Sequence, residues 1–283
     1  MRVPLQFHHV QDSNILKINW QFISIYIILF YQYVLERINQ FYELILWKNI
    51  MFNTTIPLYG IMLLLALTMN VVVVLCVYKK FNFSFLEIVA ALVYENVGII
   101  LGGKLLTLLQ NYSLYKNVDI LYLGFTSYGG AIGALIALFA FKFIVRRPFK
   151  DILFIFTPSI PLMYAIGKIG CFLAGCCYGI PYAGPGHVIY NYSLVAPAGT
   201  CLFPVQIVET IAFLFIFIYM IHKIITNKFS LRTIGISFIL CGFAKFVLDF
   251  LRISHVNILI SSNQIISIAF IVLGIIIVLK NRK

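Results

Sequence analysis

The chain has 283 residues, of which 62% are hydrophobic and only 11% are charged. Soluble globular domains have about 25% charged residues, so this composition excludes a soluble fold and makes domain counting by length meaningless. The net charge of +12 would indicate nucleic-acid binding only if a folded soluble module carried a basic patch, and the sequence contains no such module.

Residues 1–56 are predicted to form an N-terminal extension. Its stretch NWQFISIYIILFYQYVL, residues 19–35, contains Trp and Tyr anchors and an apolar run that is barely long enough to cross a bilayer. An extra span and an interfacial helix both fit this pattern, and we favour the interfacial helix. No small-residue cleavage site follows the stretch, so it is not read as a signal peptide.

Residues 57–283 are predicted to form one membrane domain of about seven transmembrane helices. Each expected helix contains an apolar run close to the roughly 20 residues that cross a bilayer core. The expected spans are about 58–78, 86–109, 129–145, 152–174, 204–222, 233–251 and 264–279. The predicted fold class is therefore an all-α integral membrane protein.

Basic residues gather in alternate loops and predict the orientation of this domain. The basic loops contain residues 79–80, 146–150, 223–232 and 280–283. The opposite loops hold little beyond Lys116 and Arg252. The positive-inside rule then predicts that the membrane domain begins on the outer side of the membrane and that its C-terminus lies on the inner side. In a bacterium, the end of the 152–174 span would face the outer leaflet of the cytoplasmic (inner) membrane.

Charged side chains inside membrane spans are costly, so each one is a candidate for a functional site. Away from the basic loops they are Glu95, Lys104, Lys168, Glu209, Lys245, Asp249 and, at the end of a span, Arg252. Lys245, Asp249 and Arg252 are spaced i, i+4 and i+7, which predicts one shared helix face. A ladder that neutralises itself and a functional site fit this spacing equally well.

Lys104 and Lys168 have no acidic residue near them in the sequence. A buried lysine pairs with an acid, loses its proton or meets an anionic ligand. Two or three such cations converging near one leaflet would form a pocket for a phosphate headgroup. Snorkelling of both side chains to the interface is the alternative.

Two glycine pairs flank these charges, Gly98-xxx-Gly102 and Gly129-xxx-Gly133. This spacing lets helix backbones approach closely, and helix packing is its commoner meaning. Glycines beside a cation or at the entrance of a span can also leave amide N–H groups facing an anion.

Seven short motifs occur in order between residues 57 and 280. They are PLYGIM from Pro57, GGKL from Gly102, SYGGAIG from Ser127, GKIGCFLAGCCYG from Gly167, PVQIVE from Pro204, KFVLDFLR from Lys245, and a glutamine at 264. In this order they resemble the motifs of the prolipoprotein diacylglyceryl transferase family. The ordered set, rather than any single motif, makes the resemblance specific.

The resemblance implies a membrane transferase that moves a diacylglyceryl group from phosphatidylglycerol to the lipobox cysteine of a prolipoprotein. Its implied partners are phosphatidylglycerol, the prolipoprotein signal peptide with its lipobox cysteine, and the lipid bilayer, with no nucleic acid. No cofactor is expected. The alternatives are a divergent paralogue acting on another lipid or acceptor, or a non-catalytic lipid-binding or transport protein. Transport would be favoured by two matching halves with broken helices, and the sequence shows no such symmetry.

The same motifs indicate the site residues. The catalytic residues implied by the resemblance are Tyr59, Tyr128, Lys168, Lys245 and Asp249. The implied substrate-binding residues are Gly60, Lys104, Gly129, Gly130, Cys171, Gly175, Gly179, Glu209 and Arg252. The reaction needs the acceptor thiol as a thiolate, and it needs cations or N–H donors at the leaving phosphate.

Several of these positions depart from the family pattern. Tyr128 stands where the family has a histidine, and a tyrosine with an ordinary pKa of about 10 is a poor base at neutral pH. Cys171 and Cys176 replace an asparagine and an acid. Lysines replace three arginines at Lys104, Lys168 and Lys245, which keeps the charge but loses the bidentate fork that grips phosphate. A buried lysine that loses its proton could serve as the missing base.

Four cysteines lie near the expected outer face: Cys171, Cys176, Cys177 and Cys201. Packing of small thiols against neighbouring helices is favoured, ahead of a loop disulfide and of thiol chemistry. His187 is the only imidazole nearby, and no Cys/His spacing of the zinc type is present, so no metal site is predicted.

Overall fold

The computed structural model describes residues 56–110, 112, 125–191, 193, 195–256 and 259–281. The chain divides into two compact units, Met1–Phe52 and Asn53–Lys283, and the described residues belong to the second. Apart from Ile56, the expected extension 1–56 and its helix at 19–35 lie outside the described residues. Both therefore stay predictions.

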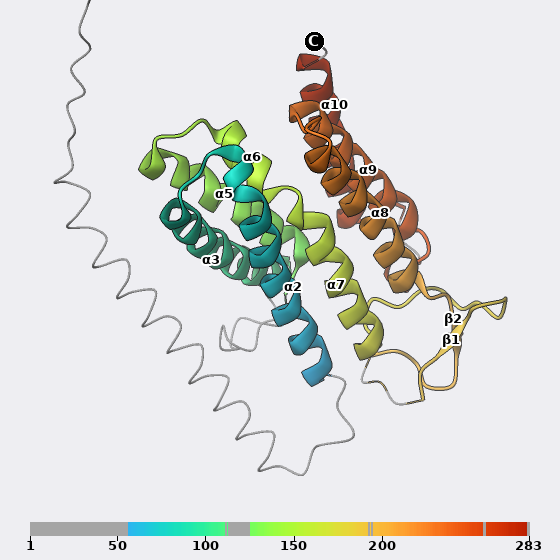
Figure 1. Cartoon of the computed structure of the whole chain (residues 1–283). Coiled ribbons are helices and arrows are strands. Elements are labelled where there is room, and N and C mark those ends of the chain that lie inside the picture. Colours follow the sequence, from blue (N-terminus) through green and yellow to red (C-terminus); the bar gives the residue numbers. More distant parts are fainter. Residues whose placement is uncertain are drawn as a thin grey trace, which may run out of the picture. The chain divides into compact units, whose positions relative to one another are not determined.

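The described residues of the second unit form helices and one short pair of strands (Figure 1). The α-helices are α2 (Ile56–Val77), α3 (Phe85–Gln110), α5 (Ser127–Val145), α6 (Phe149–Phe156), α7 (Ser159–Ala174), α8 (Val205–Ile225), α9 (Leu231–Asp249) and α10 (Ser262–Lys280). Two 3-10 helices are η1 (Tyr78–Phe81) and η3 (Ile253–His255), and the two-residue strands β1 (Val188–Ile189) and β2 (Cys201–Leu202) pair antiparallel.

Seven segments in the described part of the chain are long and apolar enough to cross a membrane, with α6 and α7 together counted as one. Thr157 and Pro158 separate α6 from α7, where proline removes one backbone donor. Each span lies close to its predicted range, which confirms the all-α membrane fold class. The α8 span ends later than predicted, at Ile225, and the α9 span ends earlier, at Asp249.

The two glycine pairs face each other between α3 and α5. A Cβ on Gly98 would lie 2.5 Å from the carbonyl oxygen of Gly133, and a Cβ on Gly129 would overlap the carbonyl oxygen of Gly102. Only glycine permits this backbone approach, so the predicted helix contact is confirmed.

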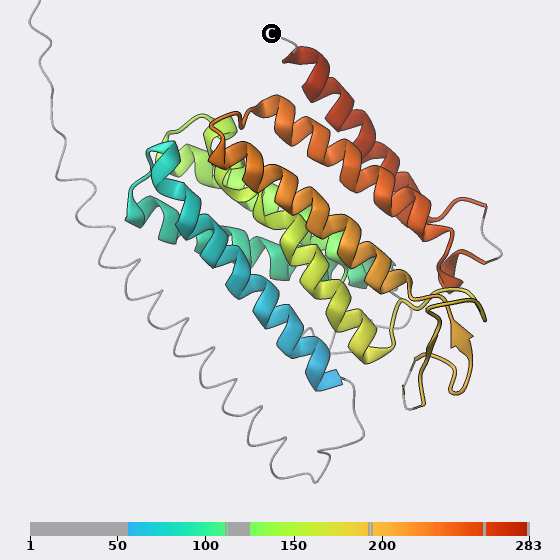
Figure 2. The ribbon, with the colours of Figure 1, turned by 45° about the vertical axis from the view of Figure 1, so that its right-hand side comes forward.

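Helix α7 lies between α2 and α8, and α9 packs against both α8 and α10 (Figures 1 and 2). The α7 backbone approaches α2 closely at Gly170, where a Cβ would lie 2.9 Å from the Cβ of Met62. Side chains of α7 therefore reach both the first membrane helix and the C-terminal helices.

The loop after α7 connects to the chain that follows α9. Gly179 forms an antiparallel bridge with Arg252, and the N–H of Ile180 donates to Leu251 O at 3.0 Å. On its other side this segment pairs with β2, where the N–H of Tyr182 donates to Cys201 O at 2.9 Å. The backbone at Arg252 is extended, with φ −95° and ψ 143°. Because the chain leaves α9 after Asp249 to make these bonds, the prediction that Arg252 shares a helix face with Lys245 and Asp249 is wrong.

Candidate functional site

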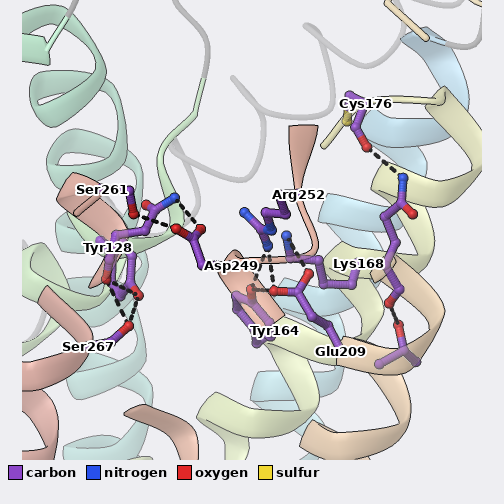
Figure 3. Close-up of polar contacts among 12 residues, drawn as sticks. Tyr128, Tyr164, Lys168, Cys176, Glu209, Asp249, Arg252, Ser261 and Ser267 are labelled. Carbon is purple, nitrogen blue, oxygen red and sulfur yellow. Dashed lines mark hydrogen bonds and ion pairs between the residues drawn. The ribbon is translucent and has the colours of Figure 1, made fainter. Parts of the chain in front are cut away.

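Glu209 of α8 is at the centre of a buried cluster of charges (Figure 3). Lys168 Nζ of α7 lies 3.0 Å from Glu209 Oε2, and Arg252 Nη2 lies 2.5 Å from Oε1. All three residues are buried. Lys168, which has no acid near it in the sequence, therefore finds one on the neighbouring helix.

Tyr164 of α7 joins the members of this cluster. Its hydroxyl donates to Glu209 Oε1 at 3.0 Å and accepts from Arg252 Nη2 at 3.5 Å. Its ring centroid lies 5.3 Å from Lys168 Nζ and 4.5 Å from Lys245 Nζ. Sequence reasoning did not include Tyr164, although it precedes Lys168 by four residues and so shares its helix face.

Lys245 of α9 lies between two aromatic rings. Its Nζ is 3.7 Å from the ring centroid of Tyr128 on α5 and 4.5 Å from that of Tyr164 on α7, both within cation–π range. The Tyr128 hydroxyl bonds Ser267 Oγ at 2.9 Å and donates to Asn263 O at 3.2 Å. Within the described part of the chain, Lys245 forms no ion pair with a carboxylate.

Asp249 belongs to a separate set of contacts at the end of α9 (Figure 3). Its carboxylate accepts from Ser261 Oγ and, at 3.1 Å, from Asn263 Nδ2. His255 Nδ1 lies 3.4 Å from Asp249 Oδ2. A self-neutralising Lys245–Asp249–Arg252 ladder is therefore wrong, since Arg252 pairs with Glu209. The sequence did not indicate His255, Ser261 or Asn263 as site residues.

Gln264 and Gln206 both lie in the motifs, and both form hydrogen bonds that hold the backbone in place. Gln264 forms a capping box with Ser261 at the start of α10. Gln206 Nε2 donates to the Cys176 carbonyl at 2.9 Å, which holds the loop after α7 against α8.

Three of the cysteines form a cluster at the end of α7. All six cysteines of the chain are free thiols, so the alternative of a disulfide within the loop is wrong. The sulfur atoms of Cys171, Cys176 and Cys177 lie within 4.8 Å of one another, a group that could hold a metal ion. Neither the sequence spacing nor the position of His187 indicated this cluster.

A helix-end motif builds the cluster. Gly175 has φ +66°, its N–H donates to Phe172 O at 3.2 Å, and the N–H of Cys176 donates to Cys171 O at 3.0 Å. These two bonds define a Schellman motif, which commonly brings the side chains at the Cys171 and Cys176 positions together. Cys177 follows with φ 52°.

The cluster lies within electrostatic reach of the buried cations. Hydrogen bonds from the Cys171 and Cys176 thiols hold the pKa of the Cys177 thiol well below its ordinary value, and the charges of Lys168 and Arg252 act in the same direction. The thiol cluster and the Glu209 cluster are therefore neighbours at one end of α7.

The other predicted residues have varied positions. Tyr59 of α2 lies beside α7, since a Cβ on Gly170 would be 3.3 Å from Tyr59 Cδ2. Lys104 is half-buried on α3, and its membership in the site stays a prediction. Gly60 has open space around the position of a Cβ, whereas a Cβ on Gly179 would overlap Phe203 O.

Gly129 and Gly130 lie in the contact between α3 and α5. A Cβ on Gly129 would meet Gly102, and one on Gly130 would lie 2.9 Å from the ring of Phe125. The N–H of Gly130 donates to Thr126 O at 3.1 Å, so it is engaged within the chain. Helix packing accounts for both glycines, and substrate binding by them stays a prediction.

Arg252 Nε and Gln206 Oε1 are among the buried polar atoms that lack a hydrogen-bond partner in the described part of the chain. Buried polar atoms in proteins are almost always paired, so such groups need an explanation. Arg252 Nε is a charged donor, which suits an anionic ligand.

The seven spans define a multi-pass membrane protein, and its buried charge cluster contains more basic side chains than carboxylates. The chain belongs to the prolipoprotein diacylglyceryl transferase family, which matches residues 45–280. It is 32% identical to the phosphatidylglycerol–prolipoprotein diacylglyceryl transferase of Clostridium tetani over 80% of this chain and 93% of that relative. A relative of the same name in Finegoldia magna is 28% identical over 82% of this chain and 94% of the relative. The predicted resemblance is thereby confirmed.

Proposed function

We propose that this chain transfers a diacylglyceryl group from phosphatidylglycerol to the lipobox cysteine of prolipoproteins, in the maturation of bacterial lipoproteins. The family membership and the names of its relatives support this assignment. The charge of the buried cluster is the structural observation that carries it.

Two cations, Lys168 and Arg252, pair with the single carboxylate of Glu209, and Lys245 lies over the ring of Tyr164 beside them. Excess charge buried within a membrane domain is costly unless a ligand compensates it. The phosphodiester of phosphatidylglycerol carries one negative charge, and the phosphate gains more when it leaves. A preorganised group of cations stabilises that developing charge.

The contacts suggest a division of roles. Glu209 fixes Lys168 and Arg252 in place, and Tyr164 holds the carboxylate and the guanidinium together. Arg252 Nε would donate to a phosphate oxygen. Lys245, held only by aromatic faces among these contacts, can turn towards the leaving group.

The reaction is a displacement at the glyceryl carbon. The lipobox thiol loses its proton to water at the membrane face, and its sulfur forms a bond to the glyceryl carbon. The bond between that carbon and the phosphate oxygen breaks, and the electron pair leaves with glycerol phosphate. No redox change occurs, so the residues need only activate the sulfur and stabilise the phosphate.

The orientation is also part of the proposal. The site lies at the end of α7 and beside the 175–203 loop, which the distribution of basic loops assigns to the outer side. Both substrates are membrane-embedded and would reach it from the outer leaflet of the cytoplasmic membrane.

Complementation tests this function. The chain is expressed in a bacterium depleted of its own diacylglyceryl transferase, and growth and prolipoprotein accumulation are followed. We expect rescue by the wild-type chain and no rescue by Lys168→Ala or Lys245→Ala. Lys142→Ala is the matched control, because Lys142 also lies over aromatic rings but on α5, away from the Glu209 cluster.

Membrane levels of each variant are compared by immunoblot, and transfer is measured with purified protein, phosphatidylglycerol vesicles and a lipobox peptide. A wild-type chain that reaches the membrane, yet neither rescues growth nor modifies the peptide, contradicts the proposed function. Equal activity of Lys245→Ala and Lys142→Ala contradicts the role given to Lys245.

A further inference from the structure

We propose that Cys171, Cys176 and Cys177 bind one Zn²⁺ ion, whose open coordination position takes the lipobox thiol. The metal site is inferred from this chain's own geometry, and only the identity of the fourth ligand rests on the proposed function. The family motifs implied no metal here, since two of the three thiols replace an asparagine and an acid of the family pattern.

The distances suit a shared metal ion. The three sulfur atoms lie within 4.8 Å of one another. Zinc binds thiolates at about 2.3 Å in a tetrahedron, which places sulfur atoms about 3.8 Å apart. Small rotations of the side chains close this difference. Thiolate sulfur is also the donor that selects zinc over the hard cations that oxygen ligands bind.

The backbone holds the three thiols ready. The two bonds of the Schellman motif place Cys176 over Cys171, and left-handed conformations at Gly175 and Cys177 turn the chain sharply. Gln206 then holds the Cys176 carbonyl from α8. Because seven consecutive residues supply all three ligands, binding needs little reordering of the chain.

The number of ligands indicates a catalytic site rather than a structural one. Within the described residues the group contains three donors and no fourth His, Cys, Asp or Glu. Structural zinc sites have four protein ligands, whereas catalytic sites have three and leave one position open. Cys171 is buried and Cys177 is exposed, so the cluster has an accessible side.

The charge of the filled site matches its surroundings. Three thiolates and one Zn²⁺ ion sum to a single negative charge, and Lys168 lies three residues before Cys171 on the same face of α7. The filled site, with its net negative charge, would therefore offset part of the positive excess around Glu209. Phosphate would compensate the remainder.

The site would supply the thiol activation that Tyr128 cannot. A thiol that coordinates zinc is deprotonated outright, and its proton passes to water. The bound sulfur attacks the glyceryl carbon, the carbon–oxygen bond to phosphate breaks, and glycerol phosphate leaves with the electron pair. The product thioether is neutral and a weaker ligand, so it dissociates and reopens the position while the ion stays in place.

Metal content is the first test and does not depend on turnover. The full chain is purified in detergent, incubated with Zn²⁺, desalted and analysed for zinc by mass spectrometry. We expect about one zinc per chain and near-complete loss in the Cys171→Ser/Cys176→Ser/Cys177→Ser variant. Cys76→Ser is the control, because it removes one thiol on α2 that is outside the cluster. Equal zinc in the triple variant and the wild type overturns the metal site.

Substitution with Co²⁺ tests the open position. The Co²⁺ form should show thiolate-to-metal absorption, and a lipobox peptide should shift this band, whereas the same peptide with serine in place of cysteine should not. An unchanged band with the cysteine peptide overturns the proposed fourth ligand. Because neither readout requires transfer, an inactive but metal-loaded chain would contradict the proposed function and leave the site standing.

Chelation links the two proposals. In phosphatidylglycerol vesicles, removal of zinc should lower transfer to the peptide by about 100-fold, in the range that an activated nucleophile contributes, and added Zn²⁺ should restore it. Full transfer by metal-free protein would overturn the catalytic role of the ion while supporting the proposed function.

Discussion

Glu95 and Glu209 are both fully buried carboxylates inside membrane-spanning helices, but their partners differ. Glu95 of α3 accepts from Asn70 Nδ2 at 2.6 Å, and Asn70 Oδ1 accepts from Ser159 Oγ at 2.6 Å. Among the described residues no cation pairs with Glu95. Glu209 instead lies among two paired cations, a tyrosine hydroxyl and a second lysine, Lys245.

This difference separates a structural polar network from a candidate site. The Glu95 network consists of neutral partners that hydrogen-bond one another, so it links α2, α3 and α7 without requiring a ligand. The Glu209 cluster retains an excess of positive charge and a buried guanidinium donor without a partner in the described residues. Both sets of residues contain a buried carboxylate, so burial alone does not indicate function. The excess of basic side chains around Glu209 does.

The largest difference in stability and activity is expected when each of the two buried carboxylates, Glu209 and Glu95, is replaced by the neutral amide of glutamine. Glu209→Gln leaves Lys168 and Arg252 close together without a counter-charge, and we expect it to cost about 3–5 kcal/mol of stability and to abolish transfer. Glu95→Gln keeps an oxygen that can accept from Asn70, so it should retain transfer activity. Denaturant unfolding in detergent and transfer to a lipobox peptide measure the two effects. Similar losses in both variants would contradict the distinction.

Both carboxylates and all seven spans could be predicted from the sequence, because apolar runs and the charges within them depend only on the order of the residues. The sequence could not show the partners. Lys168 meets Glu209 only because α7 packs on α8, and Arg252 leaves the α9 helix because the 178–180 segment pairs with residues 251–253. Such pairings are tertiary and leave no local periodicity to detect.

Tyr164 and the cluster of three cysteines were also not predicted from the sequence. Tyr164 sits in an apolar run, where a tyrosine is typical of packing, and its role appears only when Lys245 from α9 meets its ring. The spacing C-x₄-C-C resembles no zinc pattern. Its three sulfurs converge because Gly175 adopts a left-handed conformation, which the sequence permits but does not require.

The neutral network can be broken without touching the charged one. Asn70→Leu removes the partner of Glu95 and of Ser159 at once. Buried groups left unpaired cost about 1–3 kcal/mol, so we expect a loss of stability of this size. Transfer per folded molecule and the KM for phosphatidylglycerol should stay unchanged, since Asn70 has no contact with the Glu209 cluster. A raised KM at unchanged stability would show that the Glu95 network serves the substrate directly.

Tyr164→Phe tests the contribution of one hydroxyl inside the charged cluster. The ring and both of its lysine contacts remain, whereas Glu209 Oε1 loses a donor. Hydrogen bonds to charged groups contribute about 1.5–3 kcal/mol and neutral ones about 1 kcal/mol; because Arg252 still satisfies the same oxygen, we expect the smaller value. The loss should appear as a several-fold lower kcat/KM with phosphatidylglycerol. Tyr94→Phe, at a lipid-exposed tyrosine of α3, is the matched control and should leave kcat/KM unchanged.

The smallest effect is expected at a third carboxylate, Glu87 near the start of α3. Arg147 donates to it through Nε at 3.0 Å and Nη2 at 3.1 Å, but both side chains are partly exposed. Glu87 also accepts from the N–H of Ser84 at 2.8 Å, an interaction that a glutamine can keep. Glu87→Gln therefore removes only the ion pair, which should contribute about 0–1 kcal/mol and less at high salt. Unfolding of both proteins at low and high salt measures this. The stability of a solvated ion pair should depend on salt, whereas the cost of a buried excess of charge should not. A loss of stability at Glu87→Gln that is independent of salt and as large as that of Glu209→Gln would therefore contradict the distinction between the exposed and the buried carboxylate.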